Sequence, residues 1–155
     1  MPNVYDKLKE LNITLPEPPK KGGVYSSCVE FGKNLVYTSG CGPHLNGVIK
    51  FSGKLGDLSI EEGQEAARCC ALNVLAILHR DLGDLNRIKK FVKCLTLVAS
   101  NNDFYSQPQV ANGASNMLID IFGEERGCPA RSAIGVNVLP GNMPVEIEYL
   151  LEISE

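Results

Sequence analysis

Arg131 and the glutamates Glu146, Glu148 and Glu152 are the residues of this chain whose type and spacing best suit chemistry. They lie in CPARSAIGVNVLPGNMPVEIEYLLEI, residues 128–153, which alternates between apolar and other residues as two strands would. The charges occupy the positions between the apolar residues. A charged rim facing solvent would explain this pattern, and so would a binding site for a small molecule.

The spacing of these charges limits how they can cooperate. The stretch is predicted to form a hairpin, and pairing of Val138 with Val145 would place Arg131 opposite Glu152. Arg131 and Glu146 would then share a face but lie about 20 Å apart, at ~3.4 Å per strand residue. One hairpin cannot bring both to one small molecule, whereas a strand from a neighbouring subunit could. The simpler alternative is an Arg131–Glu152 surface pair worth at most about 1 kcal/mol.

The composition indicates a single globular domain. The chain has 155 residues, of which 44% are hydrophobic and 21% charged, so it can bury a core and does not resemble a disordered chain. No apolar run is long enough to cross a membrane, and MPNVYDKLKE lacks the pattern of a signal peptide, so a cytoplasmic location is expected. The net charge is −3 and no basic cluster exceeds NRIKKFVK, which disfavours nucleic acid as a partner.

The spacing of cysteines and histidines gives no sign of a metal site. The six cysteines form no C-x-x-C pair, so buried reduced thiols are expected rather than a zinc knuckle or a disulfide framework. His44 and His79 are the only histidines, and they occupy unrelated contexts. His44 belongs to GCGPHLNG, which is typical of a turn, and its side chain is expected on the surface, with a place at the mouth of the cleft as the less favoured alternative.

The first half of the chain predicts a short helix, a linker, strands and a long helix. Asn3 can cap the short helix, and PEPPKKGG then interrupts regular structure. Two short strands surround a tight turn, and GVIKFSGKLG could supply a third strand. Ser59 and Glu62 match a capping box at the start of the long helix.

The second half predicts a central strand and another helix before the hairpin. FVKCLTLVAS is mostly apolar, which is typical of a strand inside a sheet. Asn101 and Asp103 are expected to cap the second helix, which Pro108 should disturb. This order of elements predicts an α+β fold, with a mixed sheet and two helices packed on one face.

The other face of the sheet is predicted to be open. It would carry Arg131, Glu146 and Glu148 interspersed with Ala133 and other small or apolar residues. Such a face is more apolar than a free surface, and another subunit commonly covers faces of this kind. We therefore expect a homo-oligomer.

Several motifs of the chain recur together in one known family. They are Pro-Ala-Arg-Ser, a Leu-Pro turn and Glu-Ile-Glu near the end, with GVYSSCVEFGKNLVYTSG, YTSGCGP and NNDFYSQ earlier. In these motifs the chain resembles the Rid family, the YjgF-type reactive-intermediate deaminases that are also labelled endoribonuclease L-PSP. The resemblance covers about residues 22–153. It suggests an N-terminal helix and linker, residues 1–21, before a Rid-like domain, residues 22–155, and it is closer to a longer, less characterised branch.

The resemblance implies a chorismate-mutase-like fold and a homotrimer with clefts between subunits. The well-studied members hydrolyse enamine and imine intermediates, such as 2-aminoacrylate and 2-iminobutyrate, to 2-keto acids and ammonia. The ligand implied is therefore a small carboxylate-bearing imine or keto acid. No metal or organic cofactor is implied, because an iminium carbon is already electrophilic.

The resemblance also implies roles for individual residues. Arg131 stands where the family's arginine holds the substrate carboxylate with two charge-assisted hydrogen bonds. Glu146 stands where a glutamate positions or activates water and passes protons to the leaving ammonia. Tyr25 and Ser39 match positions that line the cleft and can hydrogen-bond substrate. Ala133 replaces a cysteine of the best-known deaminases, so only its backbone could contribute.

Three functions remain open from the sequence. Imine hydrolysis is the leading prediction, and a non-catalytic trimer that binds a small carboxylate metabolite is the main alternative. An endoribonuclease is the least favoured, because the sequence has no basic groove studded with aromatic residues and no histidine pair suited to RNA cleavage.

Overall fold

The computed structural model describes residues 3–154. Its helices are α1 (Val4–Glu10), α2 (Ile60–Leu82), α3 (Gln107–Phe122) and α4 (Glu124–Gly127), with the 3-10 turns η1 (Leu85–Arg87) and η2 (Pro140–Asn142). Its strands are β1 (Cys28–Phe31), β2 (Leu35–Thr38), β3 (His44–Leu45), β4 (Val48–Ile49), β5 (Ile88–Ala99), β6 (Ala130–Val136) and β7 (Val145–Ile153). Within the described residues, no helix combines the length and the apolar character that crossing a membrane requires.

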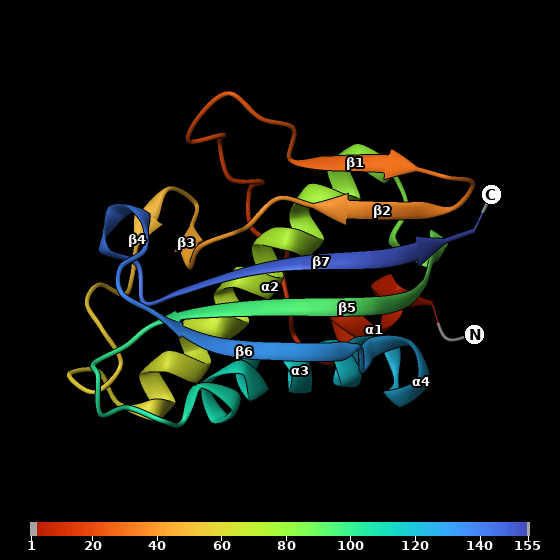
Figure 1. Ribbon diagram of the computed structural model, residues 1–155. Helices are drawn as coiled ribbons and strands as arrows, with labels where there is room; N and C mark the ends of the chain where they lie inside the picture. The colour runs from red at the N-terminus through yellow and green to blue at the C-terminus, as the bar shows by residue number, and fades with distance from the viewer. Residues whose placement is uncertain (1–2, 155) are drawn as a thin grey trace.

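Five strands form one mixed sheet in the order β1-β2-β7-β5-β6, and α2 and α3 cover one of its faces (Figure 1). β5 lies between β7, to which it is antiparallel, and β6, to which it is parallel. The predicted α+β architecture is confirmed, and so is the interior position of the strand predicted at FVKCLTLVAS, which is β5. The predicted third strand is short: β4 pairs with β3 in a separate two-stranded sheet.

Helix α2 begins and ends where its local sequence signals predict. The Ser59 hydroxyl accepts a hydrogen bond from the Glu62 backbone N–H at 3.1 Å, and the Glu62 carboxylate accepts one from the Ser59 N–H at 2.8 Å. Gly83 ends the helix with a φ of 79°, a conformation that glycine adopts at little cost. The capping box therefore fixes the start of the helix that packs behind β7.

Helix α3 begins later than the sequence predicts. Its N-cap is Ser106, which makes no side-chain cap, and Pro108 lies in the first turn. Proline is tolerated there because the first N–H groups of a helix have no helical partner. The prediction that Asn101 and Asp103 cap this helix is wrong, and the Asn101 side chain instead donates to Asp57 at 3.0 Å.

The helices and the sheet meet in one large core. Phe91 of β5 packs edge-on against Tyr149 of β7 and Phe122 of α3, with ring centroids 5.3 and 5.2 Å apart. The two long helices approach closely at Gly113, where a Cβ would collide with the backbone of Gln64. This packing fixes the buried side of β7 and thereby the alternate side chains that point to its other face.

The N-terminal helix belongs to the same core. Asn3 caps α1 by accepting a hydrogen bond from the Tyr5 N–H at 2.9 Å, as predicted. Val4 and Leu8 are buried in the main core, and the Val4 N–H donates to the Asn86 side chain at 2.9 Å. The segment that leads from α1 to β1 is therefore attached firmly at its start.

The predicted hairpin between the last two strands is wrong, because β5 lies between β6 and β7. The residues that link β6 to β7 pass the end of β5, a lateral distance of roughly 10 Å at ~4.8 Å per strand. β5 is largely buried, and its backbone N–H and C=O groups need a hydrogen-bonded strand on each side. Alternation within β6 and β7 gives no information about a strand inserted between them.

The inserted strand also determines the face on which Arg131 lies. Cys94 of β5 pairs with Arg131 on one side and with buried Tyr149 on the other, so Arg131 shares the helix-covered face. Glu146 belongs to the opposite face, and the prediction that it shares a face with Arg131 is wrong. The alternative pairing of Arg131 with Glu152 is also wrong, because Glu152 accepts a 2.8 Å hydrogen bond from a lysine of β5.

The face of the sheet away from the helices carries exposed apolar side chains. Val29, Phe31, Tyr37 and Ile134 are 52%, 44%, 44% and 48% exposed in a single chain. Their pairing partners place them on one face, across β1, β2 and β6. This is the surface that the predicted homo-oligomer would bury.

Candidate functional site

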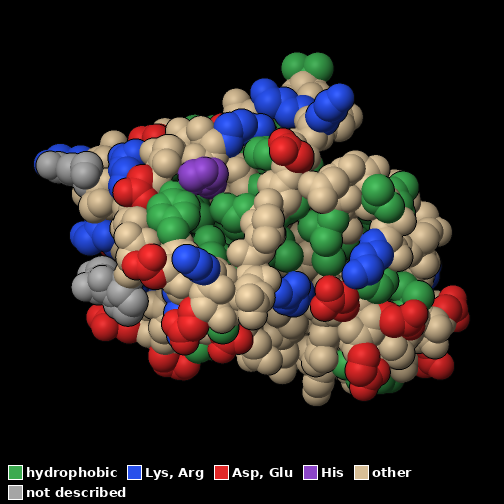
Figure 2. All heavy atoms as spheres, turned by 180° about the vertical axis from the view of Figure 1, so that it is seen from behind, with side chains coloured by type: hydrophobic (Ala, Val, Ile, Leu, Met, Phe, Trp, Pro, Cys, Tyr) green, Lys and Arg blue, Asp and Glu red, His purple; other side chains and the backbone are tan. Residues whose placement is uncertain are grey.

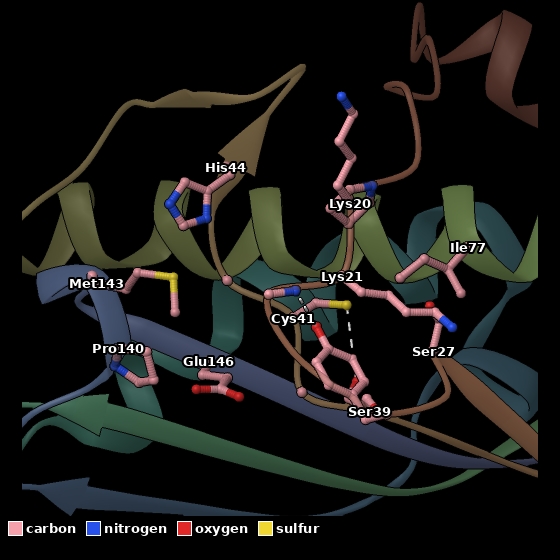
Figure 3. Close-up of a pocket in the computed structure, with 16 residues that line it drawn as sticks. Lys20, Lys21, Ser27, Ser39, Cys41, His44, Ile77, Pro140, Met143 and Glu146 are labelled. Atoms are coloured by element: carbon pink, nitrogen blue, oxygen red, sulfur yellow. Dashed lines mark hydrogen bonds between the residues drawn. The ribbon is translucent and has the colours of Figure 1, made fainter.

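A cavity of about 520 Å³ lies beside the start of β7, between the loop after β2 and the segment that precedes β1 (Figure 3). Tyr25, Ser39 and Glu146 line it together, whereas Arg131 and Ala133 do not. The rest of the lining comes from residues 19–22, the loop 39–44, Ile77 of α2 and the link before β7.

Glu146 enters the cavity from the face of β7 that the helices do not cover, and Gly40 makes room for it. The Glu146 carboxylate lies so close to the Gly40 backbone that a Cβ at position 40 would overlap with it. The loop is held there by two backbone hydrogen bonds between Cys41 and Ile147, at 2.9 and 3.0 Å. Any side chain at position 40 would therefore displace the carboxylate from this place.

The surroundings of Glu146 favour its protonated form. Burial raises the pKa of the Glu146 carboxyl above its ordinary value, and the charge of Glu148 raises it further. Glu148 is itself engaged, because the Tyr37 hydroxyl donates to it at 2.6 Å. A half-buried carboxyl whose pKa is shifted toward neutrality suits general acid–base chemistry.

Tyr25 and Ser39 present two hydroxyl groups to the same cavity. The Tyr25 oxygen accepts a hydrogen bond from the Gly22 N–H at 3.1 Å, so its own O–H remains available as a donor. The Ser39 hydroxyl donates to the Ser26 carbonyl at 2.6 Å, so its lone pairs remain available as acceptors. One donor and one acceptor thus accompany the carboxyl.

Arg131 lies on the edge strand β6, where α3 orients its guanidinium group. Nη1 donates to Asn112 at 2.9 Å and to Ser115 at 3.0 Å, and Nη2 donates to the Pro108 carbonyl at 3.2 Å. An arginine has five N–H groups, so two remain for a further partner. Ala133 follows on the same face of the same strand. One chain therefore does not unite Arg131 with the cavity.

For His44 the sequence favours the surface over the mouth of the cleft, and the structure shows the less favoured place. The His44 side chain is half-buried and lines the cavity (Figure 3). The buried side chain of Asn73 in α2 fixes the loop, because its amide donates to the Gly42 carbonyl at 2.9 Å and to the His44 carbonyl. The signal in the sequence is an asparagine in the middle of an apolar helix.

Residues 19–22 form a wall of the cavity, which their interpretation as a linker does not anticipate. The Glu17 N–H donates to the Asn46 side chain at 2.9 Å and ties this segment to the β3–β4 turn. Lys20 and Lys21 are among the lining residues, and both are exposed. Figure 2 shows lysine or arginine side chains on the segment that projects from the body of the molecule.

Cys41 also lines the cavity, but its thiol is not activated. Burial raises the pKa of Cys41 to about 12, and the charge of Glu146 contributes to the increase. A thiol with this pKa stays protonated at neutral pH and is a poor nucleophile. In residues 3–154, no group of three or more His, Cys, Asp or Glu side chains is arranged to hold a metal ion.

Comparisons with known proteins agree with this architecture. Residues 6–152 match a family model described as "YjgF/chorismate_mutase-like, putative endoribonuclease". The chain is 41% identical over 148 residues to Protein TCP17 of Trypanosoma cruzi, covering 95% of this chain and 92% of that protein. The structure of Atu1372, of unknown function, from Agrobacterium tumefaciens has a TM-score of 0.89 at 39% identity, covering 97% of this chain and 92% of that one. A Shewanella oneidensis structure with the same endoribonuclease label has a TM-score of 0.92 at 28% identity, covering 98% and 100%.

Proposed function

The chain belongs to the YjgF/chorismate-mutase-like family, and on this premise we propose that its cavity hydrolyses reactive enamine or imine intermediates to 2-keto acids and ammonia. The substrates would be of the 2-aminoacrylate or 2-iminobutyrate type. One observation carries the proposal: Glu146, half-buried and with a raised pKa, shares a cavity with the hydroxyls of Tyr25 and Ser39. This set of groups can move protons around a small polar substrate.

The reaction adds water and then expels ammonia. An enamine first takes a proton on its methylene carbon from the Glu146 carboxyl and becomes the iminium ion, which leaves Glu146 as the carboxylate. Glu146, as the carboxylate, takes a proton from water while the water oxygen bonds to the iminium carbon and the C=N electron pair moves to nitrogen. The Glu146 carboxyl then protonates this nitrogen. The C–N bond breaks, ammonia leaves with its electron pair, and the hydroxyl oxygen returns its proton to Glu146 as the carbonyl forms.

The substrate carboxylate would be held by Arg131 of a second copy of the chain. Arg131 has two N–H groups left on the edge strand of the sheet, where a neighbouring molecule can approach. A guanidinium group can bind a carboxylate with two parallel hydrogen bonds. The exposed apolar face of the sheet would be buried by the same association. We propose a homotrimer with one such site between each pair of subunits.

The test is an assay in which 2-aminoacrylate or 2-iminobutyrate is generated in situ and its decay is followed. The wild-type protein is expected to accelerate the decay, and Glu146→Gln is expected to reduce this acceleration by about 10²–10⁴-fold. Glu152→Gln is the matched control, since Glu152 lies on the same face of β7 but outside the cavity. A folded, oligomeric wild-type protein without acceleration would overturn the proposal, and so would an active Glu146→Gln variant.

A second function, binding of a small carboxylate without chemistry, is favoured by one neighbour. A structure of E. coli TdcF with bound serine has a TM-score of 0.62 at 23% identity, covering 91% of this chain and 96% of that one. Calorimetric titration with serine and 2-oxobutyrate would distinguish the two functions. Binding by a protein that leaves imine decay unchanged would support the binding function over the enzymatic one.

A further inference from the structure

The proposed reaction leaves one side of the cavity without a role. In Figure 3, His44 and Lys20 lie on one side of the cavity, and Glu146 and Ser39 lie on the other. We propose that His44 contacts the substrate and that the substrate is a 2-imino acid whose side chain ends in a second carboxylate. This inference rests on the proposed function and specifies the substrate class of the same site.

The size of the cavity exceeds what the smallest imines need. Its volume is about 520 Å³. A non-hydrogen atom fills roughly the share of one water molecule, about 30 Å³, so the six such atoms of 2-aminoacrylate fill about 180 Å³. About two thirds of the cavity would then remain for a longer side chain and for the part of the second copy that completes the site. A longer side chain could fill this space and reach His44.

The fold holds His44 in place from two directions. Asn73 is only 1% exposed, and its amide donates to the carbonyls of Gly42 and His44. A buried amide is costly unless it is hydrogen-bonded, so the position of this loop and the presence of Asn73 depend on each other. On the other side, Asn46 at the β3–β4 turn accepts from the Glu17 N–H at 2.9 Å. The histidine is thereby positioned on a supported loop, as a binding residue requires.

Basic residues border the cavity. The lining includes Lys20 and Lys21, and Glu146 is its acidic side chain. Lys21 also faces Asp81, since its charge helps to lower the pKa of that carboxyl. Lys20 lies on the same side as His44, and its exposed side chain extends away from Glu146 (Figure 3). A second carboxylate placed beside His44 would accept a hydrogen bond from the imidazole, and the exposed, flexible Lys20 side chain would turn toward it.

The two histidines of the chain allow a test with an internal control. His79 lies outside the cavity, and one of its ring nitrogens is 3.0 Å from the Tyr5 hydroxyl. The side-chain NMR signals of both histidines would be followed while 2-oxoglutarate or 2-oxobutyrate is added to the wild-type protein. These stable keto acids represent the products with and without the second carboxylate. We expect 2-oxoglutarate to shift the His44 signals more than 2-oxobutyrate does, with the His79 signals unchanged.

A variant then tests the affinity that this contact supplies. His44→Gln is expected to weaken 2-oxoglutarate binding by about tenfold, the loss of one charge-assisted hydrogen bond, and to change 2-oxobutyrate binding by less than about twofold. His79→Gln should change neither affinity. A cooperative thermal unfolding transition for each variant would serve as the control that it is folded.

The outcomes separate this inference from the proposed function. Ligand-induced shifts in the backbone amides of residues 39–42 without a shift of His44 would overturn the inference and leave the proposed function standing. Equal losses of both affinities in His44→Gln would also overturn it. If neither keto acid shifted any signal of the cavity, both the ligand class of the proposed function and the inference that depends on it would be wrong.

Discussion

Replacing Gly40 with alanine perturbs the cavity through a single methyl group. The new Cβ would overlap a carboxylate oxygen of Glu146 and lie 2.9 and 3.0 Å from its Cδ and Cγ. The backbone at Gly40 is outside the left-handed region, so alanine can adopt its conformation. The collision therefore falls on the free end of a flexible side chain, which must turn away while the loop stays in place.

The expected effect on activity is large and the effect on stability is small. A misplacement of about 1 Å in a reacting group can cost about 10²-fold in rate, so Gly40→Ala is expected to lose at least that much in kcat/KM for imine hydrolysis. The exchange of glycine for alanine stabilises by ~0.4–1 kcal/mol through the unfolded chain, which offsets the strain of moving Glu146. In a Glu146→Ala background the overlap is absent, so the same exchange is expected to stabilise the protein by about 0.5 kcal/mol.

Steady-state kinetics and urea unfolding of the four proteins in this cycle measure both effects. If Gly40 and Glu146 are in contact, the effect of Gly40→Ala on the unfolding free energy is expected to differ between the wild-type and the Glu146→Ala backgrounds. Wild-type kinetics for Gly40→Ala would refute the reasoning. An equal change in unfolding free energy with and without the Glu146 side chain would also refute it.

Three further predictions address the carboxyl, the loop and the long helix. Burial raises the pKa of Glu146 in the folded protein above its ordinary value of 4.5, so the folded protein binds this proton more tightly than the unfolded chain. The stability of the protein therefore falls as the pH rises from 4.5 through the pKa of the folded state. Glu146→Gln is therefore expected to be the more stable protein at neutral pH and to lose this advantage on acidification, and parallel urea-unfolding profiles against pH would contradict this. Asn73→Ala removes the donor to two loop carbonyls and is expected to destabilise the protein by ~1–3 kcal/mol and to raise KM. An unchanged melting temperature would show that the loop does not depend on this amide. Ser59→Ala removes the capping box and is expected to lower the free energy of unfolding by about 1 kcal/mol, or the Tm by about 2–4 °C, with imine hydrolysis unchanged. An unaltered Tm would show that the Ser59 cap does not stabilise α2.

Local signals account for the parts of the fold that the sequence predicts correctly. Ser59 and Glu62 specify the start of α2 within four residues, and the turn between β1 and β2 follows from its glycine. Pro108 is misleading because the same residue breaks a helix interior and suits a first turn. The choice depends on where the helix begins, and no cap residue marks that point.

Pairing between distant strands is not encoded in local alternation. The patterns of β6 and β7 are correct as strands, yet the partner of both is β5, which lies far earlier in the chain. That insertion turns Arg131 to the face opposite Glu146. The side of the sheet to which each side chain of an edge strand points depends on its register with the neighbouring strand, and alternation along the sequence does not give that register.

Motif resemblance predicts more of the site than physical patterns do. The resemblance to the Rid family is confirmed, and Tyr25, Ser39 and Glu146 do line one cavity. The role of each residue stays a prediction. The sequence favours the surface for His44 because the position of this residue depends on a contact with Asn73 across the fold, and a histidine in a glycine-rich loop has no periodicity that would indicate burial.

Mixed oligomers of two inactive variants provide the most direct test of a site shared between copies. Arg131→Ala and Glu146→Gln would be coexpressed with different tags, and doubly tagged oligomers would be purified and assayed for imine hydrolysis. A site between an Arg131→Ala subunit, which supplies Glu146, and a Glu146→Gln subunit, which supplies Arg131, is intact. In the proposed trimer, every mixed oligomer has one site of this kind among its three, so activity is predicted to recover to about one third of wild type while each variant alone stays inactive. Mixed oligomers as inactive as the separate variants would contradict a catalytic site built from Arg131 of one copy and Glu146 of another.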